Sequence, residues 1–265
     1  MSVPVPATRR TSDWRRPLRY LWRAPWLLLH VLVALPACIA LTNPLTAHWR
    51  IRGERSDHFA IRTWSAGLLR VFGMRTRRFG TPLPGAAMFV ANHVSWIDIT
   101  LLHSQRTVGF VAKAEIARWP LVGWLATQAG TIYHHRGDND SLHGVMHQML
   151  ARLQEGRAVG VFPEGRTCNG RELGAFHARI FQPAVLAACP VQPVALKYGA
   201  GGSAQTLVAF RPRENFVQNF WRLLGEPSRP VEVHFLEPTL AAAEGEGRRR
   251  LAQLCRERIL AAMAA

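Results

Sequence analysis

Cysteine is scarce in this chain of 265 residues. Its four cysteines, Cys38, Cys168, Cys189 and Cys255, form no Cys-x-x-Cys pair. Zinc sites and disulfide frameworks use closely spaced or paired cysteines, so we expect neither of them, and we expect no bound metal. Scattered thiols in a reducing cytoplasm are the simplest interpretation.

Acidic side chains and lysines are also few. The chain has 17 Asp and Glu against 33 Lys and Arg, a formal net charge of +16, and only Lys113 and Lys197 are lysines. Such an excess favours an anionic partner, which is a nucleic acid, an anionic membrane surface or an acidic protein. The sequence contains no helix-turn-helix, zinc-finger or aromatic RNA-binding signature, so we do not expect a nucleic-acid partner.

Charge is absent altogether between Arg23 and Arg50. Within this interval, residues 26–41 are almost continuously apolar and are interrupted only by His30 and Pro36. A spanning helix needs about 20 apolar residues. The run therefore predicts a single short span or a monotopic helix embedded in one leaflet. No clean small-x-small site follows it, which argues against a cleaved signal peptide.

Basic residues precede the apolar run, and an amphipathic stretch follows it. Arginines are dense over residues 9–23, which by the positive-inside rule places that flank at the cytoplasmic face of the inner membrane. Apolar residues recur at helical spacing over 58–72, which predicts a helix packed on the core or lying in the membrane interface. We therefore divide the chain into a basic, membrane-associated helical segment, 1–73, and a second domain, 74–265.

Strand and helix patterns alternate through that second domain, without an internal repeat. The predicted strands are 75–79, 88–91, 108–112, 131–135, 158–162, 191–198, 207–211 and 231–236. The predicted helices are 97–103, 114–128, 141–153, 175–188 and 247–264. This alternation indicates an α/β fold with a mostly parallel sheet covered by helices.

Four polar residues stand just after predicted strands: His93, Lys113, Arg136 and Glu164. In folds of this class, ligands bind outside the carboxyl ends of the strands. Their common placement predicts one shared site.

His93 precedes Asp98 by five residues, at the mouth of a predicted strand. Asp98 is suited to accept the Nδ1 proton of His93, which leaves Nε2 free to remove a proton from a substrate hydroxyl. Ser95 lies in no Gly-x-Ser-x-Gly elbow, so the nucleophile is expected to belong to the substrate. On this pair alone, a surface histidine near a helix cap is the alternative.

A second motif, Phe162-Pro163-Glu164-Gly165, follows another predicted buried strand. Together with the upstream Asn92-His93-x4-Asp98 it resembles the glycerolipid acyltransferase family, whose best known members are the 1-acyl-glycerol-3-phosphate acyltransferases. The resemblance implies that His93 and Asp98 form a catalytic dyad. It also implies that the block containing Glu164 and Gly165 helps to bind the acceptor.

Two weaker blocks match the same family in order, so that the resemblance covers roughly residues 75 to 200. The first ends at Arg136, which the resemblance makes a ligand of the acceptor headgroup, and the second is 191–196. The family's common Gly-Thr-Arg order is swapped here to Gly165-Arg166-Thr167. This form resembles a bacterial subgroup in which some members acylate lyso-ornithine lipid.

The resemblance implies an O-acyltransferase that moves a fatty acyl group from an acyl thioester to the free hydroxyl of a lyso-lipid. We expect 1-acyl-glycerol-3-phosphate as the acceptor, with lyso-ornithine lipid as the alternative, and acyl carrier protein or coenzyme A as the donor's carrier, with no bound cofactor. Lys113, Arg136 and Arg166 would hold an acidic headgroup, a role suited to arginine. Glu164, Gly165 and Thr167 complete the predicted substrate-binding set.

Three other functions are compatible with parts of the sequence. A hydrolase would use the same dyad to activate water in place of a lipid hydroxyl. A catalytically silent lipid-binding protein would share the fold, although it would not need an intact dyad. A nucleic-acid-binding protein would account for the charge but not for the uncharged N-terminal run.

Overall fold

The computed structural model describes residues 13–119, 122–135, 139–240 and 247–265. Within them, one sheet has the strand order β3-β9-β8-β4-β7-β5-β6, with β10 paired to β8. Its strands are β3 (Met74–Phe79), β4 (Met88–Ala91), β5 (Gly109–Lys113), β6 (Ile132–His134), β7 (Val159–Val161), β8 (Pro190–Tyr198), β9 (Arg229–Phe235) and β10 (Thr239–Leu240). A separate ribbon pairs β1 (Arg50–Ile51) with β2 (Glu54–Arg55).

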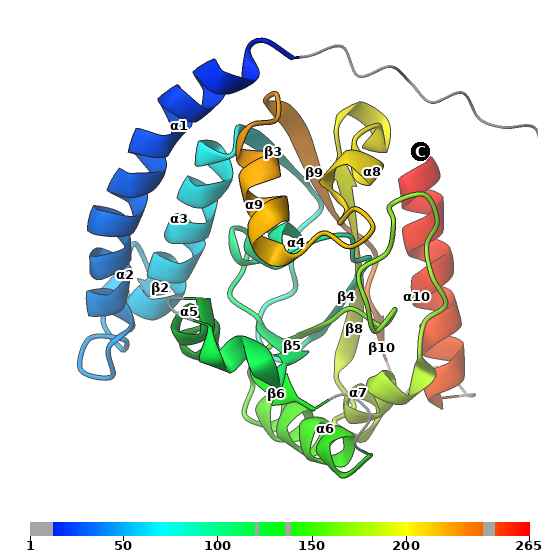
Figure 1. Cartoon of the computed structure of the whole chain (residues 1–265). Coiled ribbons are helices and arrows are strands. Elements are labelled where there is room, and N and C mark those ends of the chain that lie inside the picture. Colours follow the sequence, from blue (N-terminus) through cyan, green and yellow to red (C-terminus); the bar gives the residue numbers. More distant parts are fainter. Residues whose placement is uncertain (1–12, 120–121, 136–138, 241–246) are drawn as a thin grey trace, which may run out of the picture.

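Helices cover both faces of the sheet, and one long helical rod lies along its flank (Figure 1). The α-helices are α1 (Arg16–Leu29), α2 (Leu35–Thr42), α3 (Ser56–Val71), α4 (Ile97–His103), α5 (Val122–Gln128), α6 (Asn139–Gln154), α7 (Gln182–Leu186), α8 (Gln205–Val208), α9 (Phe216–Leu224) and α10 (Gly247–Ala264). A π-helical turn, His30–Ala34, joins α1 to α2. Short 3-10 turns occupy Ala114–Arg118, Ala178–Phe181 and Ala200–Gly202.

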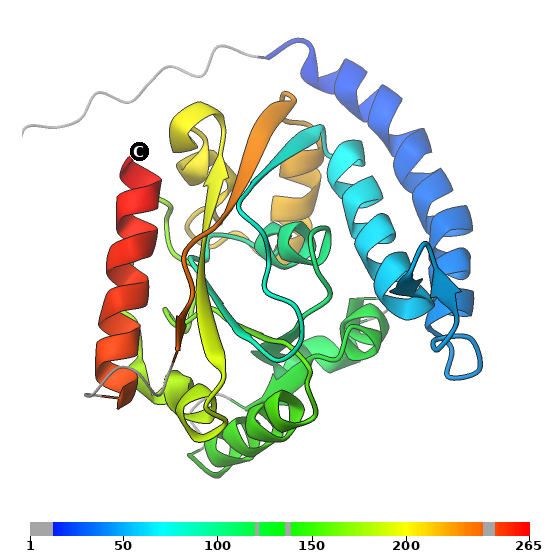
Figure 2. The same cartoon turned by 180° about the vertical axis from the view of Figure 1, so that it is seen from behind.

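The sheet is mostly parallel, as the sequence predicts. Strands β8, β4, β7, β5 and β6 run in one direction, whereas β9 is antiparallel to β8. Successive side chains of a strand point to opposite faces. Accordingly, Met88 and Val90 of β4 lie in a core with α6, α7 and α10, while Phe89 and Ala91 lie in a second core with α3, α4 and α9. Figure 2 shows α10 on the flank opposite α1.

Three predicted elements differ from the structure. The predicted strand 207–211 is wrong, because residues 205–208 form α8. A short apolar run does not distinguish a strand from a buried helical turn. The single helix predicted over 175–188 is instead a 3-10 turn followed by the short α7, and the one predicted over 114–128 begins as a 3-10 turn.

Helix α9 was not predicted, although its start has a sequence signature. The Asn215 side chain accepts from the Gln218 backbone, and the Gln218 side chain accepts from the Asn215 backbone. This reciprocal capping box satisfies two N–H groups that the first helical turn leaves without partners. An Asn-x-x-Gln before an apolar stretch is therefore the signal that locates α9.

The N-terminal helix runs continuously over Arg16–Thr42, which is 27 residues. It is long and apolar enough to cross a membrane, and only 11% of its most apolar 18-residue window is buried. Exposed apolar side chains on it include Leu18, Leu21, Trp22, Leu28 and Leu32. An exposed apolar surface of this kind marks a site of membrane or protein contact. By contrast, α3 packs on the sheet core, which is the first of the two alternatives for 58–72.

Two arginines of α1 donate hydrogen bonds to the C-terminal end of α9. Arg19 Nε donates to the Gly225 carbonyl at 2.6 Å. The buried Arg23 donates to the carbonyls of Leu224 and Glu226, both at 2.7 Å, and burial lowers its pKa. Carbonyls at a helix C-terminus have no intrahelical partner, so these guanidinium groups satisfy them and join α1 to α9.

This joint makes Arg23 a stabilising residue. We expect Arg23→Met to lower the free energy of unfolding by about 1–3 kcal/mol, because it leaves buried carbonyls without a donor. Arg15→Met is the matched control, since Arg15 is an exposed arginine that precedes the same helix. Denaturant unfolding in detergent measures both, and equal stability of the two variants would contradict this role.

Candidate active site

The parallel strands bring the predicted site residues to one edge of the sheet. His93 follows β4, Glu164 follows β7, and Lys113 ends β5, and these three strands are adjacent in the order β4-β7-β5. Neighbouring strands lie about 4.8 Å apart, which puts Lys113 roughly 10 Å along the edge from His93. Arg136 lies outside the described residues.

His93 and Asp98 are directly hydrogen bonded. Nδ1 of His93 lies 2.7 Å from Oδ2 of Asp98. Asp98 sits in the first turn of α4 and is fully buried, whereas the His93 side chain is 15% exposed. A carboxylate only accepts, so the shared proton belongs to Nδ1 and Nε2 is left as an acceptor. The pair therefore has the tautomer that a general base requires.

The imidazole plane of His93 is also fixed by packing. Its ring stacks on Phe162 with centroids 4.0 Å apart and an interplanar angle of 14°. Phe162 in turn stacks on Phe110 of β5 at 5.4 Å. The aromatic residue of the Phe162-Pro163-Glu164-Gly165 motif thus positions the histidine of the other motif.

Both carboxylate oxygens of Glu164 accept hydrogen bonds from within the protein. Glu164 is buried, and its Oε1 accepts from the His93 backbone N–H at 2.8 Å. Its Oε2 accepts from the Gly174 N–H and the Cys168 thiol, each at 2.8 Å. Both oxygens are used inside the protein, so Glu164 joins the loop after β4 to the loop after β7. Burial, with Glu164 beside the thiol, raises the pKa of Cys168 to about 11.

The next three residues, Gly165, Arg166 and Thr167, are more exposed than Glu164. Gly165 has φ +69°, a left-handed conformation that other residues rarely adopt, and a Cβ there would lie 3.3 Å from the His177 ring. Its N–H donates to the Phe162 carbonyl at 3.0 Å, so this amide is already engaged. Arg166 and Lys113 are exposed and Thr167 is partly buried, which leaves both cations accessible to a ligand.

Two further residues contact the dyad or its loop, and sequence reasoning missed both. Tyr198, at the end of β8, donates its hydroxyl proton to Oδ1 of Asp98 at 2.5 Å. Asn219 of α9 is fully buried, and its Oδ1 accepts from Ser95 Oγ at 3.2 Å and from Trp96 Nε1 at 3.0 Å. The only signal for Tyr198 was a polar group ending an apolar strand, and Asn219 belongs to the helix that was not predicted.

The clamp formed by Glu164 is testable without any substrate. We expect Glu164→Gln to lower the free energy of unfolding by about 1–3 kcal/mol. The NH2 group of the glutamine must then face a hydrogen-bond donor where Glu164 presents an oxygen. Glu172→Gln, an exposed change in the same loop, is the control. Hydrogen exchange of the His93 amide is expected to accelerate in the first variant alone. Unchanged exchange there would refute the clamp.

The sequence of this chain resembles those of known acyltransferases. The acyltransferase family model matches residues 77–197. A lyso-ornithine lipid O-acyltransferase of Pseudomonas aeruginosa is 36% identical over 203 residues, which cover 76% of this chain and 77% of that protein. A 1-acyl-sn-glycerol-3-phosphate acyltransferase of Neisseria gonorrhoeae is 31% identical over 192 residues, 72% of this chain and 75% of that protein.

A solved structure has the same fold. The crystal structure of the 1-acyl-sn-glycerophosphate acyltransferase PlsC from Thermotoga maritima matches with a TM-score of 0.67 and 18% identity, over 94% of this chain and 98% of that one. The order of the motifs, the shared fold and the 36% identity all agree, and the chain belongs to the acyltransferase family.

Proposed function

We propose that His93 is the general base of an O-acyltransferase that acylates the free hydroxyl of a lyso-lipid. The observation that carries this proposal is a partly exposed histidine side chain whose Nδ1 is hydrogen bonded to a fully buried carboxylate. A hydroxyl within hydrogen-bond reach of Nε2 is the proton donor that such a base serves. The rest of the reaction follows from this placement.

Nε2 removes the hydroxyl proton as the acceptor oxygen attacks the thioester carbonyl. Asp98 stabilises the imidazolium that forms, by the logic of a hydrolase triad. The tetrahedral intermediate collapses with cleavage of the C–S bond, and the imidazolium returns its proton to the leaving thiolate. The products are an ester and a free thiol. No residue of the protein is acylated in this scheme.

The oxyanion of the intermediate needs donors near the motif that follows β7. The amide of Gly165 is bonded to the Phe162 carbonyl, so it is a poor candidate. We assign the role to the amides that follow it, of Arg166 and Thr167, because the left-handed backbone at Gly165 turns the chain at that point. The exposed guanidinium of Arg166 and the ammonium of Lys113 then hold the headgroup, with Arg136 as a further ligand.

Lyso-ornithine lipid is the acceptor we place first. The relative from Pseudomonas aeruginosa carries that name and is 36% identical, against 31% for the Neisseria protein named for 1-acyl-sn-glycerol-3-phosphate. The swapped Arg166-Thr167 order supports the same choice. The second candidate, 1-acyl-glycerol-3-phosphate, is supported by the Neisseria relative.

The donor and the membrane complete the proposal. An acyl thioester of acyl carrier protein or coenzyme A supplies the fatty acid, and the excess of basic residues suits either polyanion. The apolar surface of α1 and α2 seats the enzyme on the cytoplasmic face of the inner membrane, as a monotopic helix or a single short span. Lyso-lipid acceptors reside in that surface.

The roles of the dyad predict the behaviour of two variants. We expect His93→Ala and Asp98→Asn each to lower kcat by at least about 100-fold, since general base catalysis typically contributes 100- to 10,000-fold. Both proteins should remain folded and membrane-bound. His147→Ala, an exposed histidine on α6, is the matched control. The measurement is product formation by mass spectrometry, and near wild-type turnover of folded His93→Ala would refute the mechanism.

The acceptor is identified by competition between two lyso-lipids. With purified protein and one acyl thioester, we expect a higher kcat/KM for lyso-ornithine lipid than for 1-acyl-glycerol-3-phosphate. The double variant R166T/T167R restores the common family order, and we expect it to shift that ratio toward the phosphate acceptor. Equal ratios in the two proteins would show that the swapped pair does not choose the headgroup. Fatty acid release without any acceptor would instead indicate a hydrolase.

A further inference from the structure

Asp98 is bonded from two sides, and only one side belongs to the histidine. Its Oδ2 accepts from His93 Nδ1 and from the backbone N–H groups of Val94 and Ser95, at 2.7, 2.7 and 2.9 Å. Its Oδ1 accepts from the Tyr198 hydroxyl at 2.5 Å. The carboxylate is fully buried and receives no bond from a lysine or arginine among the described residues.

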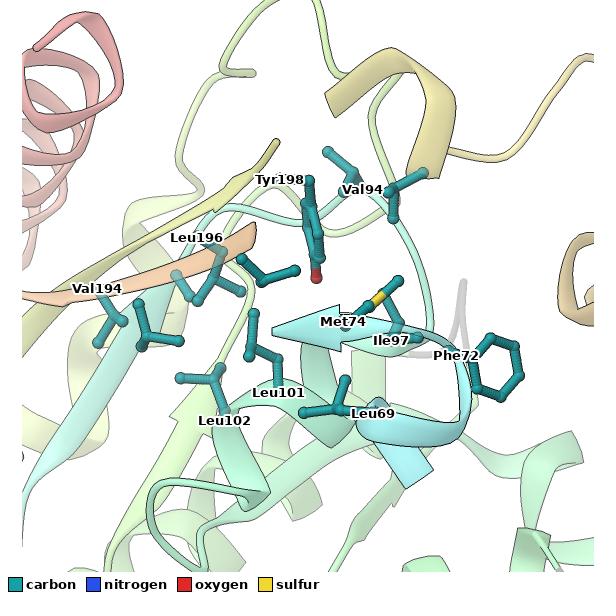
Figure 3. Packing of buried hydrophobic residues seen from close by; sticks show 14 of the residues in the cluster. Leu69, Phe72, Met74, Val94, Ile97, Leu101, Leu102, Val194, Leu196 and Tyr198 are labelled. Carbon is teal, nitrogen blue, oxygen red and sulfur yellow. The ribbon is translucent and has the colours of Figure 1, made fainter. Parts of the chain in front are cut away.

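Tyr198 is itself held firmly in place. It is fully buried at the end of β8, where its N–H donates to Gln205 Oε1 at 2.9 Å and its carbonyl accepts from Ala204 N–H at 2.7 Å. Figure 3 shows its hydroxyl directed toward the helix that carries Ile97 and Leu101. Burial and the neighbouring carboxylate raise its pKa well above the ordinary value, so the phenol stays protonated and always donates.

We propose that Tyr198 is a positioning residue that sets the basicity of the His93–Asp98 pair through its hydrogen bond to Asp98. This inference rests on the proposed role of His93 as the base. A neutral donor stabilises a buried carboxylate without neutralising it. The phenol therefore stabilises the Asp98 carboxylate in an apolar core, where the imidazolium of His93 is a cation that can form against it.

Loss of the hydroxyl has a defined electrostatic consequence. Without the phenol, negative charge concentrates on Asp98 and its attraction for the imidazolium increases. The base is then protonated, and inactive, up to a higher pH. The acid limb of the kcat/KM profile reports the base in the free enzyme. It should move upward by about half to one pH unit, which is less than the roughly one to two units expected for a hydrogen bond made directly to the titrating charge.

Other ionisable groups near the pair remain unchanged in this comparison. Glu164 binds the His93 amide, and the Cys168 thiol binds Glu164. Arg222 of α9 forms an ion pair with Glu214, and the pKa of Glu214 is lowered to about 2. Burial lowers the pKa of His103, on the same helix as the dyad aspartate, to about 4, so it is neutral. Removing the phenol alters none of their contacts.

The test compares two opposite changes at position 198. Tyr198→Phe removes the donor, and site-specific 3,5-difluorotyrosine makes it stronger at nearly constant shape. We expect the acid limb of kcat/KM to move up in the first protein and down in the second, with KM for the acceptor changed less than kcat. The His93 ring titration, followed by NMR and assigned with His93→Gln, should move in the same directions. Tyr20→Phe, which removes a hydroxyl bonded to the Trp221 carbonyl, is the control.

The outcomes separate this proposal from the proposed function. Opposite shifts of the limb in the two proteins support the role of Tyr198. Limbs that stay at the wild-type pH, or that move in the same direction, overturn it, even if activity falls. Turnover by His93→Ala equal to wild type would instead overturn the proposed function itself. If Tyr198→Phe does not fold, the fluorinated protein alone decides, because an unmoved limb there contradicts the proposal.

Discussion

The buried carboxylate of Asp98 is the contact on which the arrangement of the site depends. Four donors reach it from two separate parts of the chain: the His93 ring and two amides of the loop after β4, and the phenol at the end of β8. A buried charge is costly unless it is fully hydrogen bonded. The loop therefore has one favourable conformation, in which Nδ1 of His93 is held by Asp98 and the ring stays partly exposed.

A second buried carboxylate holds the same loop from its other side. Glu164 binds the His93 amide and, through Gly174 and Cys168, the loop after β7. Phe162 stacks on the His93 ring from the same motif. Two sequence motifs that lie about 70 residues apart are thus one structural unit, which is a physical reason for them to occur together.

Sequence reasoning located most strands of the large sheet, and the dyad, because each depends on short-range pattern. Buried strands such as β4 and β8 read as apolar runs, and Asp98 lies within reach of His93 along the chain. It could not foresee contacts such as Tyr198 with Asp98, which are 100 residues apart and follow from sheet order. It also could not foresee the bond from the His93 amide to Glu164, since a carboxylate in a motif gives no sign that it is buried. Asn219 was missed with α9.

The link between α1 and α9 shows why the basic N-terminus is more than a membrane signal. Arg19 and Arg23 satisfy carbonyls at the C-terminal end of α9, while Asn219, within that helix, accepts from Ser95 and Trp96 beside the dyad. The helix that carries the exposed apolar surface is therefore connected through α9 to the loop that carries His93. Both connections are made by buried or partly buried hydrogen bonds. The distance between His93 and the apolar surface of α1 is therefore fixed by the fold.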